Sequence, residues 1–274
     1  MRTESVVRSI DGSAKQTIPL PQVFQTPFRP EVIHRVYVNL LSHRYQRQGR
    51  YPAAGEIVSA ESRNTGLGIA RLARIRGQGF SRSGQAAGVA GVRAGRVAHP
   101  PESWKLIRKK INKKERRLGL SSAIAATARK DLIQRRGHII EGISSFPIVS
   151  SDDIESVTKA RDLLKILVAF GLANDLLRAR RPKKSRKSAT SKERGTLHAA
   201  KSALIIVKRG SKVVRLSKSI PGVDVRTADT VSVLDLAPGS KPIRLTIFSR
   251  GSLDYLESSL REISITRRLR AEDE

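Results

Sequence analysis

Ala203-Leu204-Ile205-Ile206-Val207 is the stretch that decides the fold. A continuous run of five apolar residues, rich in β-branched side chains, is typical of a strand in a sheet that is covered on both faces. Shorter apolar runs that we also interpret as strands lie at residues 6–10, 147–149, 223–225 and 245–248.

Segments with helical spacing of apolar residues alternate with these strands. We expect helices at 31–41, from 104 to 117, from an N-cap at Ser121 to Leu132, from Asp152 to a stop at Gly171, at 213–219 and at 252–260. Strands that alternate with helices predict an α/β layered fold with a mainly parallel sheet.

The charge of the chain is large and unevenly placed. There are 53 Lys and Arg against 24 Asp and Glu, a net charge of +29. Residues 62–101, 105–117 and 178–187 contribute +7 each, so three short runs supply 21 of the 29 charges. Nucleic acid is the default partner of such a protein, and the rest of the chain has the charge of an ordinary globular body.

Residues 62–101 are the most unusual part of the chain. They contain seven arginines and eight glycines but no Asp, Glu or Lys. They cannot bury enough apolar surface for a core of their own, and their charge is self-repelling without a polyanion. Guanidinium groups grip phosphate through paired hydrogen bonds, so the exclusive use of Arg favours RNA.

The other two basic runs could also have a role other than RNA binding. Eight like charges at 105–117 are either a solvated helix face or a phosphate-binding surface, and the repulsion among them favours RNA. A linker is the stronger rival for 178–187. Aromatic residues make up only 4% of the chain, which argues against a general mode of base stacking.

Several classes of chemistry find no support in the sequence. The absence of cysteine excludes disulfides, thiolate zinc sites and cysteine nucleophiles. The five histidines lack zinc-helix spacing, and the Gly-x-Gly pairs at 66–68 and 77–79 complete no cofactor or phosphate-loop motif. No apolar run is long enough for a membrane span, and Met1 to Ile10 lack the apolar core of a signal peptide. We therefore expect a cytoplasmic protein with no enzyme activity, cofactor, metal or membrane partner.

A family resemblance emerges from motifs spread along the chain. Gly66-Leu67-Gly68-Ile69-Ala70-Arg71 through Ala98-His99-Pro100-Pro101 resembles the loop of the fourth protein of the large ribosomal subunit, of the archaeal–eukaryotic type. The blocks at 112–118, 121–128, 203–207, 235–239 and 244–248 fit that family in the same order, and the resemblance covers about residues 5 to 257. The lack of a long C-terminal extension favours the archaeal side.

The resemblance implies a three-layer α/β/α body and a long extended basic loop. It also implies a structural role in the ribosome, in which the loop enters ribosomal RNA and helps to line the nascent-peptide exit tunnel. We expect a body at 1–43 and 120–260, an inserted arm at 44–119 that holds the extended loop 62–101 and the basic segment 105–117, a basic loop at 178–196 and a tail at 261–274. The expected partners are large-subunit ribosomal RNA, neighbouring ribosomal proteins and the nascent peptide.

The residues expected to bind RNA are the basic side chains of these runs: Arg63, Arg71, Arg74, Arg76, Arg82, Arg93, Arg96, His99, Lys109, Lys110, Lys113, Lys114, Arg116, Arg117, Arg180, Arg181, Lys183 and Lys184. The residues expected at the loop tip, near the tunnel wall, are Arg74, Arg76, Gly77, Gln78, Gly79 and Arg82. The alternative functions are an RNA-processing enzyme on an α/β fold, or a free RNA chaperone with disordered arms.

Overall fold

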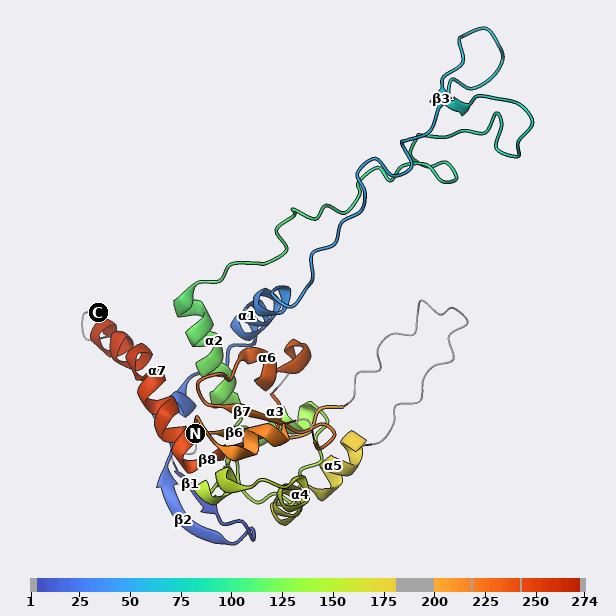
Figure 1. Cartoon of the computed structure of the whole chain (residues 1–274). Helices are drawn as coiled ribbons and strands as arrows, with labels where there is room; N and C mark the ends of the chain where they lie inside the picture. The colour runs from blue at the N-terminus through green and yellow to red at the C-terminus, as the bar shows by residue number, and fades with distance from the viewer. Residues whose placement is uncertain (1–3, 181–199, 218, 242, 272–274) are drawn as a thin grey trace. The chain divides into compact units, whose positions relative to one another are not determined.

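The computed structural model describes residues 4–180, 200–217, 219–241 and 243–271 (Figure 1). The chain forms two compact units. The sheet unit comprises Met1–Leu41 with Lys110–Glu274, and the inserted unit comprises Ser42–Lys109. The sheet unit therefore takes up residues 110–119, which the sequence-based division placed in the arm.

A six-stranded sheet is the centre of the sheet unit. Its strands are β1 (Glu4–Arg8), β2 (Ala14–Pro19), β5 (Ile148–Ser150), β6 (Leu204–Val207), β7 (Asp224–Thr227) and β8 (Thr246–Ser249). The strand order is β2-β1-β5-β8-β6-β7, and only the β1–β2 hairpin is antiparallel. The predicted mainly parallel α/β fold is confirmed.

Strand β6 shows why both faces of this sheet are covered. Leu204 and Ile206 belong to one hydrophobic cluster, whereas Ile205 and Val207 belong to another. Successive side chains of a strand point to opposite faces. The continuous apolar run thus serves two cores, one on each side, and all four residues are fully buried.

One face of the sheet is covered by α1 (Pro30–Ser42), α2 (Lys113–Ala126), α6 (Val233–Leu236) and the first part of α7 (Arg250–Ala271), together with a 3₁₀ turn, η1 (Gln22–Gln25). Helices α1 and α2 approach closely at Gly119, where a Cβ atom would lie 2.7 Å from Val36 Cγ2. The buried hydroxyl of Ser122 donates to Pro27 O and accepts from the Arg29 N–H, so it ties α2 to the chain before α1.

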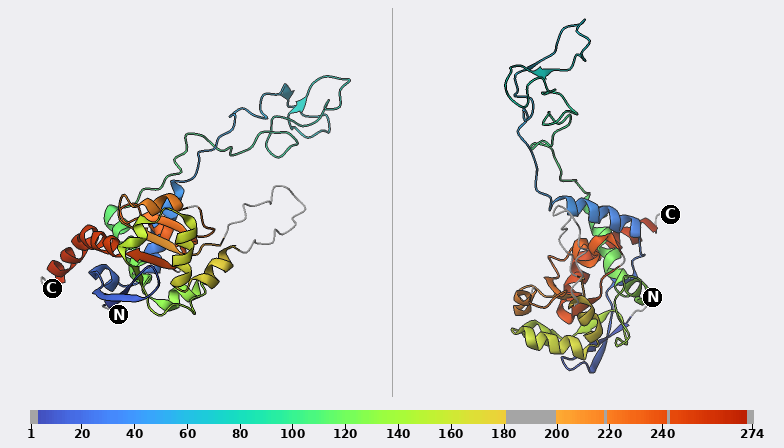
Figure 2. Two further views of the ribbon diagram at one scale, coloured as in Figure 1. Left: turned by 60° about the horizontal axis from the view of Figure 1, so that its bottom comes forward. Right: turned by 90° about the vertical axis from the view of Figure 1, so that its right-hand side faces the viewer.

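The opposite face is covered by α3 (Lys130–Arg135), α4 (Ala160–Ala169) and α5 (Ala173–Arg180), together with two 3₁₀ turns, η2 (Asp152–Ser156) and η4 (Lys212–Leu216). Figure 1 and the right-hand view of Figure 2 place α4 and α5 across the sheet from α1 and α2. This arrangement is the three-layer α/β/α body that the resemblance implied. Another 3₁₀ turn, η5 (Pro238–Ser240), follows α6.

Three predicted helices were placed wrongly. Residues 105–112 are not helical, and α2 begins only at Lys113, because like charges at helical spacing disfavour a helix there. Ser121 lies inside α2, where its hydroxyl donates to Arg117 O at 3.0 Å, instead of capping the helix. The helix predicted from Asp152 is broken by extended backbone at Val157 and Lys159 into η2 and α4.

The ends of the predicted loop and tail also differ from expectation. Residues 178–180 belong to helix α5 and not to a basic loop. Helix α7 continues to Ala271, so most of the predicted tail is helical. No helix in the described ranges has both the length and the apolar character that a membrane crossing needs.

Candidate nucleic-acid interface

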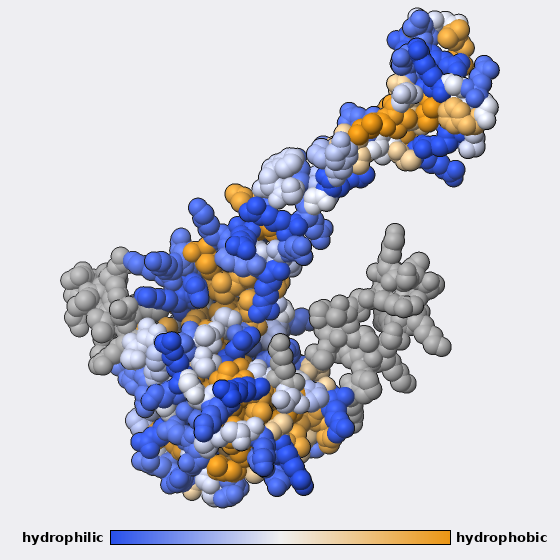
Figure 3. Space-filling model, viewed as in Figure 1, coloured by the Kyte–Doolittle hydropathy of each residue, from blue (hydrophilic) through white to orange (hydrophobic). Residues whose placement is uncertain are grey.

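The inserted unit is strongly basic and has almost no core. Thirteen Lys and Arg face three Glu between residues 42 and 109, a net charge of +10. Ala87 is the one buried apolar side chain among these residues, all of which the structure describes. On the surface of this unit, hydrophilic and apolar residues lie interspersed (Figure 3). A segment with so little apolar burial is held mainly by its backbone hydrogen bonds.

The two ends of the inserted unit are fastened to each other. The Lys109 N–H donates to Ser42 Oγ at 2.9 Å, and the His43 ring lies 2.9 Å from Lys109 O through Nε2. Farther in, the Arg50 N–H donates to Pro101 O at 3.2 Å. The chain therefore enters and leaves the inserted unit through two segments that lie side by side.

The predicted loop tip is an ordered hairpin. Strand β4 (Arg74–Ile75) pairs with β3 (Ala60–Glu61) on one side, and Arg74 bridges to Ala86 on the other. The Ile75 N–H donates to Gln85 O, and the Gly84 N–H donates to Ile75 O at 3.1 Å. Residues 62–101 thus fold back on themselves more than once within the long extended loop that the resemblance implied.

Glycines make the reversal at the tip possible. Gly77, Gly79 and Gly84 have φ angles of +106°, +86° and +72°. Only glycine adopts these values without strain, so the sequence places glycine where the turn needs it. Gln78 and Phe80 between these positions are exposed.

The arginines of 62–101 fall into two groups. Arg74 is half-buried and donates to Gly84 O at 3.0 Å, while Arg76 pairs with Glu61, so both stabilise the hairpin. The other five guanidinium groups are exposed and make no hydrogen bond or ion pair with the described part of the chain: Arg63, Arg71, Arg82, Arg93 and Arg96. His99 is exposed as well.

The second basic run meets the start of α2. Lys109 and Lys110 precede the helix, and Lys113, Lys114, Arg116 and Arg117 lie in its first turns; all six are exposed. Asn112 is at the N-cap but makes no side-chain capping bond, and Glu115 pairs with Arg35 at 3.1 Å. Cations at the positive end of a helix are unfavourable, whereas an anion there is stabilised by the uncapped N–H groups.

Only the start of the third basic run, residues 178–180, lies within the described residues. Arg180 is exposed at the end of α5, whereas Arg181, Lys183 and Lys184 lie outside the described residues. Arg178, which the sequence counted in this run, is turned inward. Its Nε donates to Asp175 Oδ1 at 2.8 Å, and Nη2 donates to Lys201 O at 2.9 Å.

Asp175 is the centre of a buried polar cluster that the sequence did not reveal. Its carboxylate accepts from His138 Nδ1 at 3.1 Å, Ser202 Oγ at 2.6 Å and the Ile139 N–H at 3.1 Å, besides Arg178. Burial alone would raise the pKa of Asp175, but the hydrogen bonds from His138, Arg178 and Ser202 outweigh it and hold the pKa well below its usual range. Burial lowers the pKa of His138, although Asp175 opposes that shift.

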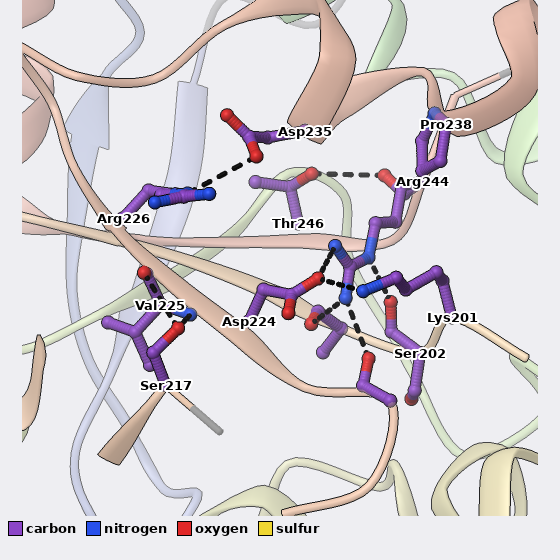
Figure 4. Close-up of polar contacts among 12 residues, drawn as sticks. Lys201, Ser202, Ser217, Asp224, Val225, Arg226, Asp235, Pro238, Arg244 and Thr246 are labelled. Atoms are coloured by element: carbon purple, nitrogen blue, oxygen red, sulfur yellow. Dashed lines mark hydrogen bonds and ion pairs between the residues drawn. The ribbon is translucent and has the colours of Figure 1, made fainter. Parts of the chain in front are cut away.

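A second buried cluster joins the start of β7 to the segments that precede β6, β7 and β8 (Figure 4), and Arg244, two residues before β8, is its centre. Arg244, which is 1% exposed, donates to Ser202 O at 2.5 Å, Ala203 O at 2.8 Å, Gly222 O at 2.6 Å and Asp224 Oδ2 at 2.6 Å. These hydrogen bonds make the guanidinium a structural link between the strand ends. Burial lowers the pKa of Arg244, and Asp224 opposes this shift.

These clusters are not arranged for catalysis. The Leu245 N–H points at His138 Nε2 at 3.4 Å, and Nδ1 is hydrogen-bonded to Asp175. Neither ring nitrogen is therefore free to act as a base. Ser202 donates to the carboxylate instead of the imidazole, and all three residues are buried. Among the described residues, no three His, Asp or Glu side chains form a metal site.

Comparison with known proteins agrees with the fold and the charge pattern. The model of the Ribosomal protein L4/L1 family matches residues 18–259. "Large ribosomal subunit protein uL4" of Methanopyrus kandleri is 36% identical over 260 residues, covering 94% of this chain and 100% of that protein. The proteins of the same name from Methanococcus vannielii and Sulfolobus acidocaldarius are each 38% identical, over 92% and 93% of this chain and 97% and 95% of their own lengths.

These relatives are named as ribosomal proteins and not as enzymes. The family match extends over most of the chain, and the relatives align across nearly all of it. The chain belongs to the ribosomal protein L4/L1 family.

Proposed function

We propose that this protein is a structural constituent of the large ribosomal subunit in the cytoplasm, where its inserted unit binds ribosomal RNA. The observation that carries the proposal is the set of five exposed arginines that have no partner in the described part of the chain, on a unit with almost no core. Phosphates neutralise such charges and replace the missing core as the source of order. The names of the archaeal relatives support the assignment to the large subunit.

The start of α2 adds a second RNA-binding surface in the same proposal. Its basic side chains and uncapped N–H groups all favour an anion at one place. A phosphate there removes the repulsion among Lys113, Lys114 and Arg116. This surface belongs to the sheet unit, so RNA contact is not confined to the insertion.

Salt dependence tests the RNA proposal. A variant with Gln at Arg63, Arg71, Arg93 and Arg96 removes four of the free charges. If all four contact phosphates, the slope of log affinity against log salt becomes shallower by about 3. A matched control places Gln at Lys159, Arg161, Lys165 and Lys212, which are exposed on the α4 side of the sheet unit. Equal slopes for the two variants would contradict a specific role for the inserted unit.

We further propose that the hairpin tip lies near the wall of the nascent-peptide exit tunnel. What supports this is the resemblance of the loop, together with an ordered turn that presents Gln78 between two glycines of positive φ. A photoreactive residue at position 78 tests it in assembled ribosomes. Labelling of stalled nascent chains or tunnel RNA is expected, whereas labelling of surface RNA alone would refute the placement.

The two alternative functions make different demands on the sheet unit. An RNA-processing enzyme needs an accessible base or cofactor site, and the His138–Asp175–Ser202 cluster is buried. A free chaperone with disordered arms does not require a cooperative α/β core. Two continuous hydrophobic clusters on the sheet favour a cooperative body and therefore the structural role.

A further inference from the structure

Most aromatic residues of the sheet unit are buried or half-buried, with Tyr255 as the exposed exception, whereas those of the inserted unit are exposed. In the sheet unit, Phe24, Phe146, Phe170 and Phe248 are buried. The four aromatic side chains of the inserted unit are all exposed: Tyr45 at 55%, Tyr51 at 63%, Phe80 at 48% and Trp104 at 63%. Single exposed aromatics need no explanation, but a unit that exposes all of its aromatics while lacking a core holds them for something else.

Two of these residues flank the place where the outgoing and returning segments of the inserted unit touch. The Arg50 N–H donates to Pro101 O, and a Cβ atom at Gly49 would lie 2.9 Å from Ser103 Cβ. Tyr51 follows this contact on the outgoing segment, and Trp104 follows it on the returning one. Backbone contact therefore brings two segments that are far apart in the sequence together, with Tyr51 and Trp104 just beyond it.

A cation is the direct sequence neighbour of three of the four exposed aromatic residues of the inserted unit. Arg50 precedes Tyr51, Lys105 follows Trp104, and Arg44 precedes Tyr45. Planar rings next to guanidinium or ammonium groups are the pattern of single-stranded nucleic-acid sites, where the ring stacks on a base and the cation holds the phosphate.

We propose that Tyr51 and Trp104, at the Arg50–Pro101 contact, form a stacking site for an unpaired nucleobase of RNA. The proposal rests on the proposed function and adds a ligand class to it: the face of a base, in addition to the phosphate backbone. Paired bases are stacked within their duplex, so the site selects a bulged, looped or unpaired nucleotide. The low overall aromatic content does not argue against one local site.

An apolar protein segment is the competing occupant. In the sequence, Arg44, Arg47 and Arg50 precede Tyr51 and Lys105 follows Trp104, with Glu102 as the one nearby acid on the returning segment, and the inserted unit has a net charge of +10. Such a surface is unfavourable for an apolar segment, which cannot compensate the charge, but it suits an aromatic base that is joined to phosphate.

The fluorescence of Trp104 provides a direct test, because Trp104 is the one tryptophan of the chain. The full chain is titrated with single-stranded polyuridylate, with an RNA duplex of the same length, and with heparin, a polyanion without bases. Strong quenching by the single strand, with much weaker quenching by duplex and heparin at saturation, is expected. Equal quenching by all three would overturn the stacking site.

Substitutions separate stacking from charge. Trp104→Leu and Tyr51→Leu are each expected to weaken binding of a labelled single strand by about 5- to 150-fold, with no change in the salt slope. Trp104→Phe is expected to restore most of the affinity. The control is Tyr255→Leu, at a residue that is also exposed but belongs to the sheet unit.

The outcomes distinguish the two proposals. If the Leu variants bind like the native chain while the salt slope remains steep, the stacking site is refuted and phosphate binding stands. If the native chain binds no RNA, the proposed function fails. Circular dichroism verifies folding, and the exposure of both side chains makes a loss of fold unexpected.

Discussion

The sheet unit is expected to fold without most of the insertion. The change we propose is a replacement of residues 51–100 by a short glycine linker, which joins Arg50 to Pro101 where they already share a hydrogen bond. Neither hydrophobic cluster of the sheet unit contains a residue from 42–109, so no core contact is lost. The contacts between the two ends of the inserted unit, at Ser42, His43 and Lys109, remain.

The magnitude follows from loop closure. The linker makes the connection about four times shorter, which is two halvings of its length. Each halving reduces the entropic cost of closing the loop by about 0.6 kcal/mol, so the folded state gains about 1 kcal/mol. The free energy of unfolding should therefore be unchanged or about 1 kcal/mol higher, with a similar dependence on denaturant because little surface changes.

Urea unfolding followed by circular dichroism measures this difference. Ile124→Ala, at a fully buried position of α2, is the sensitivity control and should lower the free energy of unfolding by about 2–5 kcal/mol. A shortened chain that loses its cooperative transition, or about 3 kcal/mol of stability, would show that the inserted unit is part of the body.

Three further predictions concern the sheet unit. Asp175→Ala should lower the free energy of unfolding, measured in urea, by about 3–5 kcal/mol because it leaves buried donors unpaired. Asp175→Asn should lower it less, and equal, small losses for the two variants would contradict this account. Because the pKa of His138 is lowered on folding, stability should decrease as pH falls below about 6.5, and decrease again below about 4, where unfolded Asp175 takes up a proton first. His138→Gln should abolish only the upper step in urea titrations at several pH values. A profile that is flat from pH 8 to 4 would refute the upper step, and one that stays flat below pH 4 would refute the lower step. Gly119→Ala should destabilise the chain through a clash with Val36, and Val36→Ala should relieve part of that loss in a double-mutant cycle measured by thermal unfolding; additive effects would exclude the contact.

The layered fold could be predicted because the apolar pattern is strong and local. The run at 203–207 supplies both faces of a covered strand, and the alternation of strands with helices leaves few topologies. Helix ends were less predictable. The start of α2 depends on repulsion among cations before Lys113, and the break between η2 and α4 is extended backbone at Val157 and Lys159 inside an apolar pattern that looked continuous.

The polar clusters could not be predicted from the sequence. Asp175 and His138 are 37 residues apart, and Arg244 reaches carbonyls of residues 202, 203 and 222. Nothing local distinguishes these side chains from solvated ones, and Arg178 even lies within a basic run. The charge of the inserted unit was evident, but the division into two hairpin-stabilising and five free arginines depends on how residues 60–87 pair.

Co-sedimentation with archaeal large ribosomal subunits tests the central claim most directly. The native chain and the chain shortened between Arg50 and Pro101 are each assembled into subunits, which are then centrifuged through a cushion of high salt. We expect the native chain to remain with the large subunit and the shortened chain, although folded, to be released to a greater extent because it lacks the five free arginines. Release of the native chain at a salt concentration that leaves other subunit proteins bound, or equal retention of both chains, would contradict an inserted unit that anchors this protein to ribosomal RNA.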